Sequence, residues 1–118
     1  MRAFFYLKTC NTCIKIQNQL KLPEEIELRE LKSKPITAIE LEHLQTLSGS
    51  YESLFNRRSK LYTSMGLKHE ALLEKDYRHY ILDHYSFLKR PVLILDDKIY
   101  IGNSKKEVDG ALNHLQSL

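Results

Sequence analysis

The chain has 118 residues, 42% of them hydrophobic, and a formal net charge of +3, which predicts one soluble domain with a core of its own. Lys and Arg number 18 against 15 Asp and Glu. This excess is too small to predict direct nucleic-acid binding, although it permits an anionic substrate or partner. No apolar stretch is long enough for a transmembrane helix and no signal peptide is recognisable, so we expect a cytoplasmic protein with no membrane partner.

The first third of the chain has the pattern of a β-α-β unit. We expect a buried strand at 3–7, a helix at 11–21 that Pro23 ends, and a second strand at 26–30. In the second strand apolar and polar residues alternate, which is typical of a strand buried on one face.

The middle of the chain, from about 36 to 85, is expected to be helical. Thr37 and Glu40 have the spacing of a capping box, and Gly49 is suited to close the helix that they open. Further helices are expected at 51–55, 59–65 and 70–84. The tyrosines and His84 in this stretch are interpreted as packing or surface residues.

The last part of the chain predicts a β-hairpin followed by a helix. Strands are expected at 92–95 and 98–101, joined by Asp96 and Asp97. Ser104 and Glu107 have the spacing of a second capping box. The inward face of the terminal helix is expected to hold Val108, Ala111, Leu112 and Leu115.

Cys10 and Cys13, the only cysteines, lie between the first strand and the first helix. A cysteine at a helix N-terminus is next to unpaired backbone N–H groups, which favour the reactive thiolate. In a reducing compartment this spacing predicts a redox pair, the alternative being two small buried residues. The five His residues are scattered, so no metal site is expected.

The Cys-x-x-Cys turn and the order of elements together predict a thioredoxin-like α/β fold. A crossover helix makes the first two strands parallel and a hairpin makes the last two antiparallel, so the four-stranded sheet must be mixed. We expect one domain spanning 1–118, with the helical segment at about 36–85 as an insertion.

At this point the chain resembles the arsenate reductase ArsC and Spx family of thioredoxin-like proteins. The motifs that carry the resemblance span nearly the whole chain: Cys10-Asn11-Thr12-Cys13, Arg57-Arg58-Ser59-Lys60 with Leu61-Tyr62, Leu88-Lys89-Arg90-Pro91, and Ile101-Gly102. The combination of Cys-x-x-Cys with Arg-Ser-Lys is most similar to the Spx branch, since arsenate reductases coupled to glutaredoxin usually carry one cysteine in this loop.

The resemblance implies that Cys10 is the nucleophile and that arginines hold an oxyanion. Arg58 and Arg90 match two of the three arginines of arsenate reductases, and Pro91 matches the cis proline opposite the redox turn. The third arginine normally follows the glycine of the last strand, where this chain has Gly102-Asn103-Ser104-Lys105. A lysine offers a point charge rather than the bidentate fork of arginine, which argues against efficient arsenate reduction.

Each of these basic residues also has a structural interpretation. Arg90 and Pro91 are also compatible with a plain strand start, and Arg57, Arg58 and Lys60 with a solvated helix face. We expect Arg57 to face solvent, and Lys8 to add positive potential near Cys10.

The sequence leaves two main functions open, of which we favour the first, and a third possibility is a family member that has lost both and keeps only a thiol switch. The first is a thiol-dependent oxidoreductase in which Cys10 attacks an oxyanion or a disulfide and Cys13 resolves the intermediate. It would hold no cofactor and be re-reduced by glutathione, glutaredoxin or thioredoxin. The second, implied by the Spx resemblance, is a redox-sensing regulator that binds the α-subunit of RNA polymerase. The missing arginine and the intact Cys-x-x-Cys favour the regulator. The end at Leu118 favours the enzyme, because Spx proteins continue with a further tail.

Overall fold

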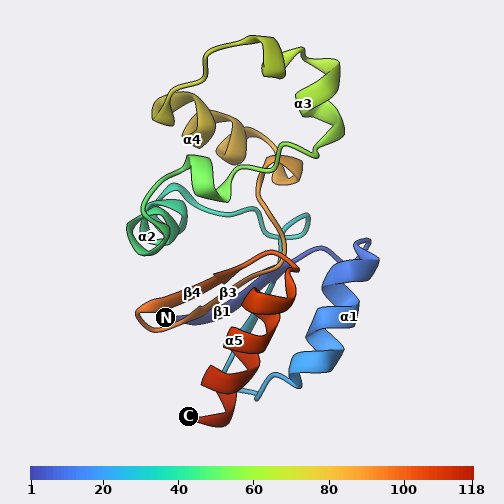
Figure 1. Cartoon of the computed structure of the whole chain (residues 1–118), viewed down its shortest axis with the longest axis vertical. Coiled ribbons are helices and arrows are strands. Elements are labelled where there is room, and N and C mark those ends of the chain that lie inside the picture. The colour runs from blue at the N-terminus through green and yellow to red at the C-terminus, as the bar shows by residue number, and fades with distance from the viewer. The chain divides into compact units, whose positions relative to one another are not determined.

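The computed structural model describes all residues 1–118, which form two compact units. The sheet unit comprises Met1–Lys34 and Arg90–Leu118, and the helical unit comprises Pro35–Lys89 (Figure 1). The second unit covers the segment expected to be helical; that both units belong to one domain stays a prediction. No helix has the length and hydropathy that crossing a membrane would require.

The sheet unit contains a mixed four-stranded sheet, as predicted, in the order β2-β1-β3-β4. Strand β1 pairs in parallel with β2 and antiparallel with β3, which in turn pairs antiparallel with β4. The strands span Arg2–Tyr6 (β1), Glu27–Glu30 (β2), Val92–Leu95 (β3) and Lys98–Ile101 (β4). The hairpin of β3 and β4 has the predicted bounds.

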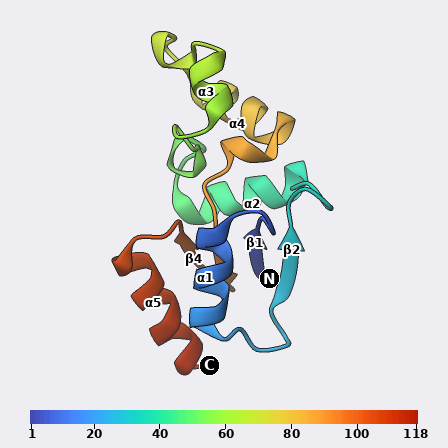
Figure 2. The ribbon, with the colours of Figure 1, turned by 90° about the vertical axis from the view of Figure 1, so that its right-hand side faces the viewer.

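Helices α1 (Asn11–Leu20) and α5 (Lys105–Gln116) cover one face of this sheet (Figure 2). Between them lies a core to which β1, β3 and both helices contribute. It includes Phe4, Tyr6, Cys13, Ile16, Leu20, Leu93, Leu95, Val108 and Ala111. The opposite-facing residues of β1 and β3, such as Phe5 and Ile94, are also fully buried. Burial on both faces explains why these two strands read as continuous apolar runs.

The alternation expected for the second strand was wrong. Leu28 is 48% exposed, whereas Arg29 is only 3% exposed and Glu30 is 9% exposed. Arg29 pairs with Phe5 in the register of β1 and β2, and its guanidinium carbon lies 5.3 Å from the centre of the Phe5 ring. The arginine is buried because the aromatic face accepts its cation, while Leu28 lies on an edge strand with a neighbour on one side only.

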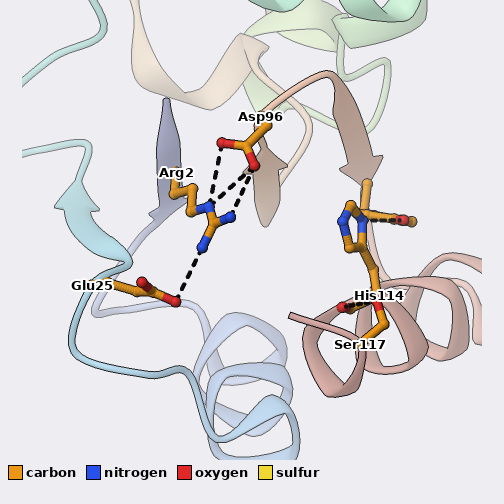
Figure 3. A network of polar contacts seen from close by, with 6 residues as sticks. Arg2, Glu25, Asp96, His114 and Ser117 are labelled. Atoms are coloured by element: carbon orange, nitrogen blue, oxygen red, sulfur yellow. Dashed lines mark hydrogen bonds and ion pairs between the residues drawn. The ribbon is translucent and has the colours of Figure 1, made fainter.

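A charged network joins three segments of the sheet unit (Figure 3). Arg2 of β1 donates to Asp96 in the hairpin turn, at 3.0 and 3.2 Å, and to Glu25 ahead of β2, at 3.1 Å. Asp96 has a φ of 59°, a left-handed conformation that Asp tolerates in tight turns. The network lies at the start of β1, opposite to the end that leads into Cys10.

At the N-terminus of helix α5, only one of the two hydrogen bonds of a capping box is formed. The Ser104 hydroxyl accepts the Glu107 N–H at 3.2 Å, as predicted. The Glu107 carboxylate, however, accepts the Ile101 N–H at 3.2 Å instead of returning to the cap. The expected reciprocal box is therefore half made, because β4 offers the carboxylate a competing donor.

The helical unit contains α2 (Ala38–Ser48), α3 (Lys60–Ser64) and α4 (Glu74–Asp83), with three 3-10 turns at Glu52–Leu54, Leu67–His69 and Tyr85–Phe87. The capping box of Thr37 and Glu40 is complete, and Gly49 closes α2. Phe55 stacks on Phe87, with ring centres 5.4 Å apart, in the core of this unit. Helix α4 is shorter than predicted because Leu73, 59% exposed, is its N-cap rather than part of its buried face.

Candidate redox site

Cys10 is the N-cap residue of α1. Its backbone is extended (φ −95°, ψ 105°), and its Sγ accepts the Cys13 N–H at 3.4 Å. The Cys10 N–H donates to the Leu7 carbonyl at 3.2 Å, which closes the turn that leads out of β1. A sulfur thus occupies the position that Ser, Thr, Asp or Asn usually takes, where unpaired N–H groups of the first turn favour negative charge.

These surroundings lower the pKa of the Cys10 thiol. Burial alone would raise it, but hydrogen bonds from the side chain and N–H of Cys13, the positive charge of Arg90 and the Thr12 N–H together favour the thiolate more strongly. Cys10 is also only partly buried, unlike Cys13. A partly exposed thiol with a lowered pKa has the properties of an attacking sulfur.

Cys13 has the opposite character. It is fully buried in the core between the sheet and α1. Burial, together with the neighbouring Cys10 thiolate, raises the pKa of its thiol to about 12, while the Leu7 backbone and Arg90 oppose the shift. Cys13 is therefore protonated at neutral pH, and it is the more buried of the two cysteines.

Arg90 and Pro91 lie at the same end of the sheet as the redox turn. Val92 pairs with Phe5 in the antiparallel register, so Pro91 comes level with the last residue of β1 and Arg90 with the residue after it. The Arg90–Pro91 bond is cis, as the resemblance implied, and the Pro91 carbonyl accepts the Gly102 N–H at 2.8 Å. Arg90 is the one cation among the main influences on the thiol pKa of both cysteines.

Replacing Arg90 by alanine should therefore slow alkylation of Cys10. Loss of the positive charge raises the thiol pKa, so we expect the rate at pH 7 to fall by about threefold. The rate is measured with iodoacetamide, the modified residue being identified by mass spectrometry. Arg2→Ala is the matched control, since it removes an arginine of the same unit at the far end of β1. Equal rates in Arg90→Ala and the control would make Arg90 a structural residue.

Arsenate reductases carry their third arginine just after the last strand, and this chain has Lys105 in that region. Gly102 has a φ of 83° and ends β4. Lys105 follows in the first turn of α5, where its Nζ lies 2.7 Å from the Asp109 carboxylate and its side chain is 90% exposed. Its charge is thus balanced by Asp109, so it is a poor substitute for a guanidinium aimed at an anion.

Arg58 lies in the helical unit, on the loop before α3, and its side chain is exposed. The loop is held by polar contacts: the Arg58 N–H donates to the Asn56 side chain at 3.1 Å, and the buried Ser59 hydroxyl bonds that of Ser86 at 2.8 Å. Neighbouring Arg57 is bound to Glu52 at 2.7 Å. The sheet unit thus brings Cys10, Cys13, Arg90 and Pro91 together, whereas a role for Arg58 beside them stays a prediction.

One residue of this region, Glu30 at the end of β2, is not indicated by any pattern in the sequence. Its carboxylate accepts the N–H of Lys8, two residues before Cys10, at 3.0 Å. In the sequence, Glu30 resembles any charged residue at a strand end, because the contact depends on the pairing of β1 with β2. Lys8 itself is exposed.

The model of the ArsC family matches residues 5–111. The chain belongs to the ArsC family. Among curated proteins it is similar to the global transcriptional regulator Spx of Streptococcus pneumoniae, with 25% identity over 112 residues that cover 92% of this chain and 83% of the regulator.

Solved structures share the fold. An arsenate reductase from Vibrio cholerae superposes with a TM-score of 0.76 at 12% identity, covering 95% of each chain. An arsenate reductase related protein from Brucella melitensis gives a TM-score of 0.71 at 20% identity, covering 92% of each chain. The family and its thioredoxin-like fold are those that the motifs and the order of elements predicted.

Proposed function

We propose that this ArsC family member is a thiol-dependent oxidoreductase, similar to arsenate reductases, in which Cys10 is the nucleophile and Cys13 the resolving thiol. The observation that carries the proposal is the Cys10 sulfur at the N-cap of α1, where it accepts the Cys13 N–H at 3.4 Å. An activated, accessible sulfur one helical turn from a buried second thiol is the arrangement that dithiol–disulfide exchange requires.

With a disulfide substrate, the Cys10 thiolate attacks one sulfur, forms a mixed disulfide and releases the other sulfur as a thiolate. Cys13 then loses its proton and attacks the Cys10 sulfur, forming the Cys10–Cys13 disulfide and releasing the second thiolate. The substrate gains two electrons, and the two cysteines lose them. An external thiol reductant, such as glutathione, glutaredoxin or thioredoxin, returns the pair to the dithiol, so no bound cofactor takes part.

With arsenate, Cys10 would displace an oxygen as water, and attack by Cys13 on the Cys10 sulfur would release arsenite together with the disulfide. The arsenic gains the two electrons that the cysteines lose. Arg90 would hold the oxyanion, and the ion pair of Lys105 with Asp109 weakens the third arginine position. This weakness favours a disulfide over an oxyanion as the substrate.

A second candidate is a redox-responsive transcriptional regulator, supported by the curated Spx relatives at about 25% identity. In this role the same two cysteines form a reversible disulfide, which changes the surface that binds the partner. The partner is the α-subunit of RNA polymerase. Both candidates need the Cys10–Cys13 disulfide, and they differ in whether the protein turns over a substrate.

One experiment separates the two. Reduced protein is supplied with arsenate or a small disulfide together with glutathione and a thioredoxin or glutaredoxin system, and consumption of reductant is followed over many turnovers. The oxidoreductase predicts catalytic consumption that scales with enzyme concentration. Consumption that stops after one equivalent, together with direct binding of purified RNA polymerase that changes on oxidation, would overturn the enzyme in favour of the regulator.

A further inference from the structure

Glu30 is a buried carboxylate that ties two loops together. One oxygen accepts the Lys8 N–H at 3.0 Å. The other accepts the Lys32 N–H at 3.0 Å, the Ser33 N–H at 2.8 Å and the Ser33 hydroxyl at 3.1 Å. Burial opposes the negative charge, but the hydrogen bonds from Lys8, Ser33 and Lys32 outweigh it and lower the pKa of Glu30, so the carboxylate is ionised at neutral pH.

The Lys8 contact lies inside the turn that presents Cys10. On one side of Lys8, the Tyr6 carbonyl accepts the Leu31 N–H at 2.9 Å, the last backbone bond between this end of β1 and the chain after β2. On the other side, the Leu7 carbonyl accepts the Cys10 N–H at 3.2 Å. Glu30 therefore fixes the backbone between the end of the sheet and the reactive cysteine, at a point that the strand pairing no longer controls.

We propose that Glu30 is a positioning residue for the redox turn, whose carboxylate holds the Lys8 N–H and thereby keeps the Cys10 sulfur at the N-cap of α1. The inference rests on the proposed function for its importance, since it assumes that Cys10 is the reacting group. The 3.4 Å contact from the Cys13 N–H to the Cys10 sulfur depends on where the turn places Cys10. A group that holds this turn acts on the thiol through geometry and without touching it.

Geometry and charge predict opposite effects for the removal of Glu30. If the carboxylate acted only as a nearby negative charge, removing it would favour the Cys10 thiolate and speed its alkylation. If it positions the turn, removing it loosens the hydrogen bond from the Cys13 N–H to the Cys10 sulfur. The thiolate then loses stabilisation, and alkylation at neutral pH slows.

The test measures the rate of Cys10 alkylation against pH in Glu30→Ala and Glu30→Gln, with folding checked by circular dichroism. We expect Glu30→Ala to react at least about threefold more slowly than the parent at pH 7. Glu30→Gln should be intermediate, because its amide keeps an oxygen acceptor toward only one loop. Glu27→Ala is the matched control, since it removes an exposed carboxylate of the same strand whose nearest cation is Arg29 at 4.0 Å.

Rates in the Glu30 variants equal to or faster than the parent would overturn the proposal. If Glu30→Ala does not fold, Glu30→Gln decides by the same criterion. Amide hydrogen exchange at Lys8 gives a readout independent of thiol chemistry, and it should accelerate in both Glu30 variants but not in Glu27→Ala. A parent protein with a protected Lys8 amide but an unreactive Cys10 would refute the proposed function alone, whereas a reactive Cys10 with Glu30 variants unchanged would refute the role of Glu30 alone.

Discussion

Replacing Cys10 by serine should reduce turnover of any substrate to the uncatalysed background, a loss on the order of 10³-fold or more. The hydroxyl of serine is not ionised at neutral pH and cannot form the mixed disulfide that starts the reaction. Serine is nevertheless among the best N-cap residues, so α1 should keep its cap and the protein its stability. The measurement is reductant consumption in the coupled assay, with urea denaturation of parent and variant as the control for folding.

The outcome that would remove Cys10 as the nucleophile is a folded Cys10→Ser variant that retains turnover within tenfold of the parent. Turnover by Cys13→Ser would then show whether Cys13 is the nucleophile instead, because Cys13 is the only other cysteine in the chain.

Replacing Cys13 by serine should trap the mixed disulfide between Cys10 and the substrate thiol. Cys10 keeps its place at the N-cap, so the first attack proceeds, but no thiol remains to resolve the adduct. Mass spectrometry of the protein after reaction with a small disulfide should show one adduct per chain, located on Cys10. The double variant with both cysteines replaced by serine is the control and should carry none.

If Cys13→Ser accumulates no adduct under conditions in which the parent forms the Cys10–Cys13 disulfide, Cys13 is not the resolving thiol. Sustained turnover by Cys13→Ser with glutathione would lead to the same conclusion, because an external thiol would then perform the second step.

The pair of cysteines is suited to react in a fixed order. In the resting state the Cys10 thiolate, by its charge and its hydrogen bond, helps to raise the pKa of Cys13. Both influences disappear once the Cys10 sulfur is bonded to a substrate sulfur. Burial still opposes ionisation of Cys13, but the Leu7 backbone and Arg90 then act in its favour without opposition from Cys10. The first step therefore prepares the second.

The elements set by local signals were predictable from sequence. The hairpin of β3 and β4 follows from two apolar runs separated by Asp96 and Asp97, and it has the expected bounds. The cap of α2 follows from the spacing of Thr37 and Glu40, which are neighbours along the chain. Cys10 as an N-cap follows in the same way from the junction of strand and helix.

Features that depend on which strands become neighbours were not predictable from the same signals. Arg29 is buried because the β1–β2 register places it beside Phe5, whereas the alternating pattern had assigned it to solvent. The Glu107 carboxylate accepts an N–H of β4 instead of completing the capping box of its own helix. Glu30 reaches the redox turn because β2 ends beside the exit of β1. The contacts of Arg29 and Glu30 join segments far apart in sequence, whereas that of Glu107 depends on how β4 packs beside the start of α5.

The substrate class depends on the partners that the basic side chains find in the folded protein. The motif around Arg90 is local, and its effect on Cys10 is present in the sheet unit. The lysine at the third arginine position was visible in the sequence, but its ion pair with Asp109, four residues further along α5, was not predicted. This pair is the structural reason to test disulfides before arsenate.

The central claim is that Cys10 is an activated thiol beside an inert one, and the rate of alkylation of each cysteine against pH tests it most directly. The pKa of Cys10 is lowered, so its rate should reach the plateau at a pH below that of an ordinary thiol, whose pKa is about 8.5. Cys13, with a pKa of about 12, should stay unmodified throughout the neutral range. A Cys10 that titrates at or above the ordinary value, or a Cys13 that reacts equally fast, would contradict a poised redox site.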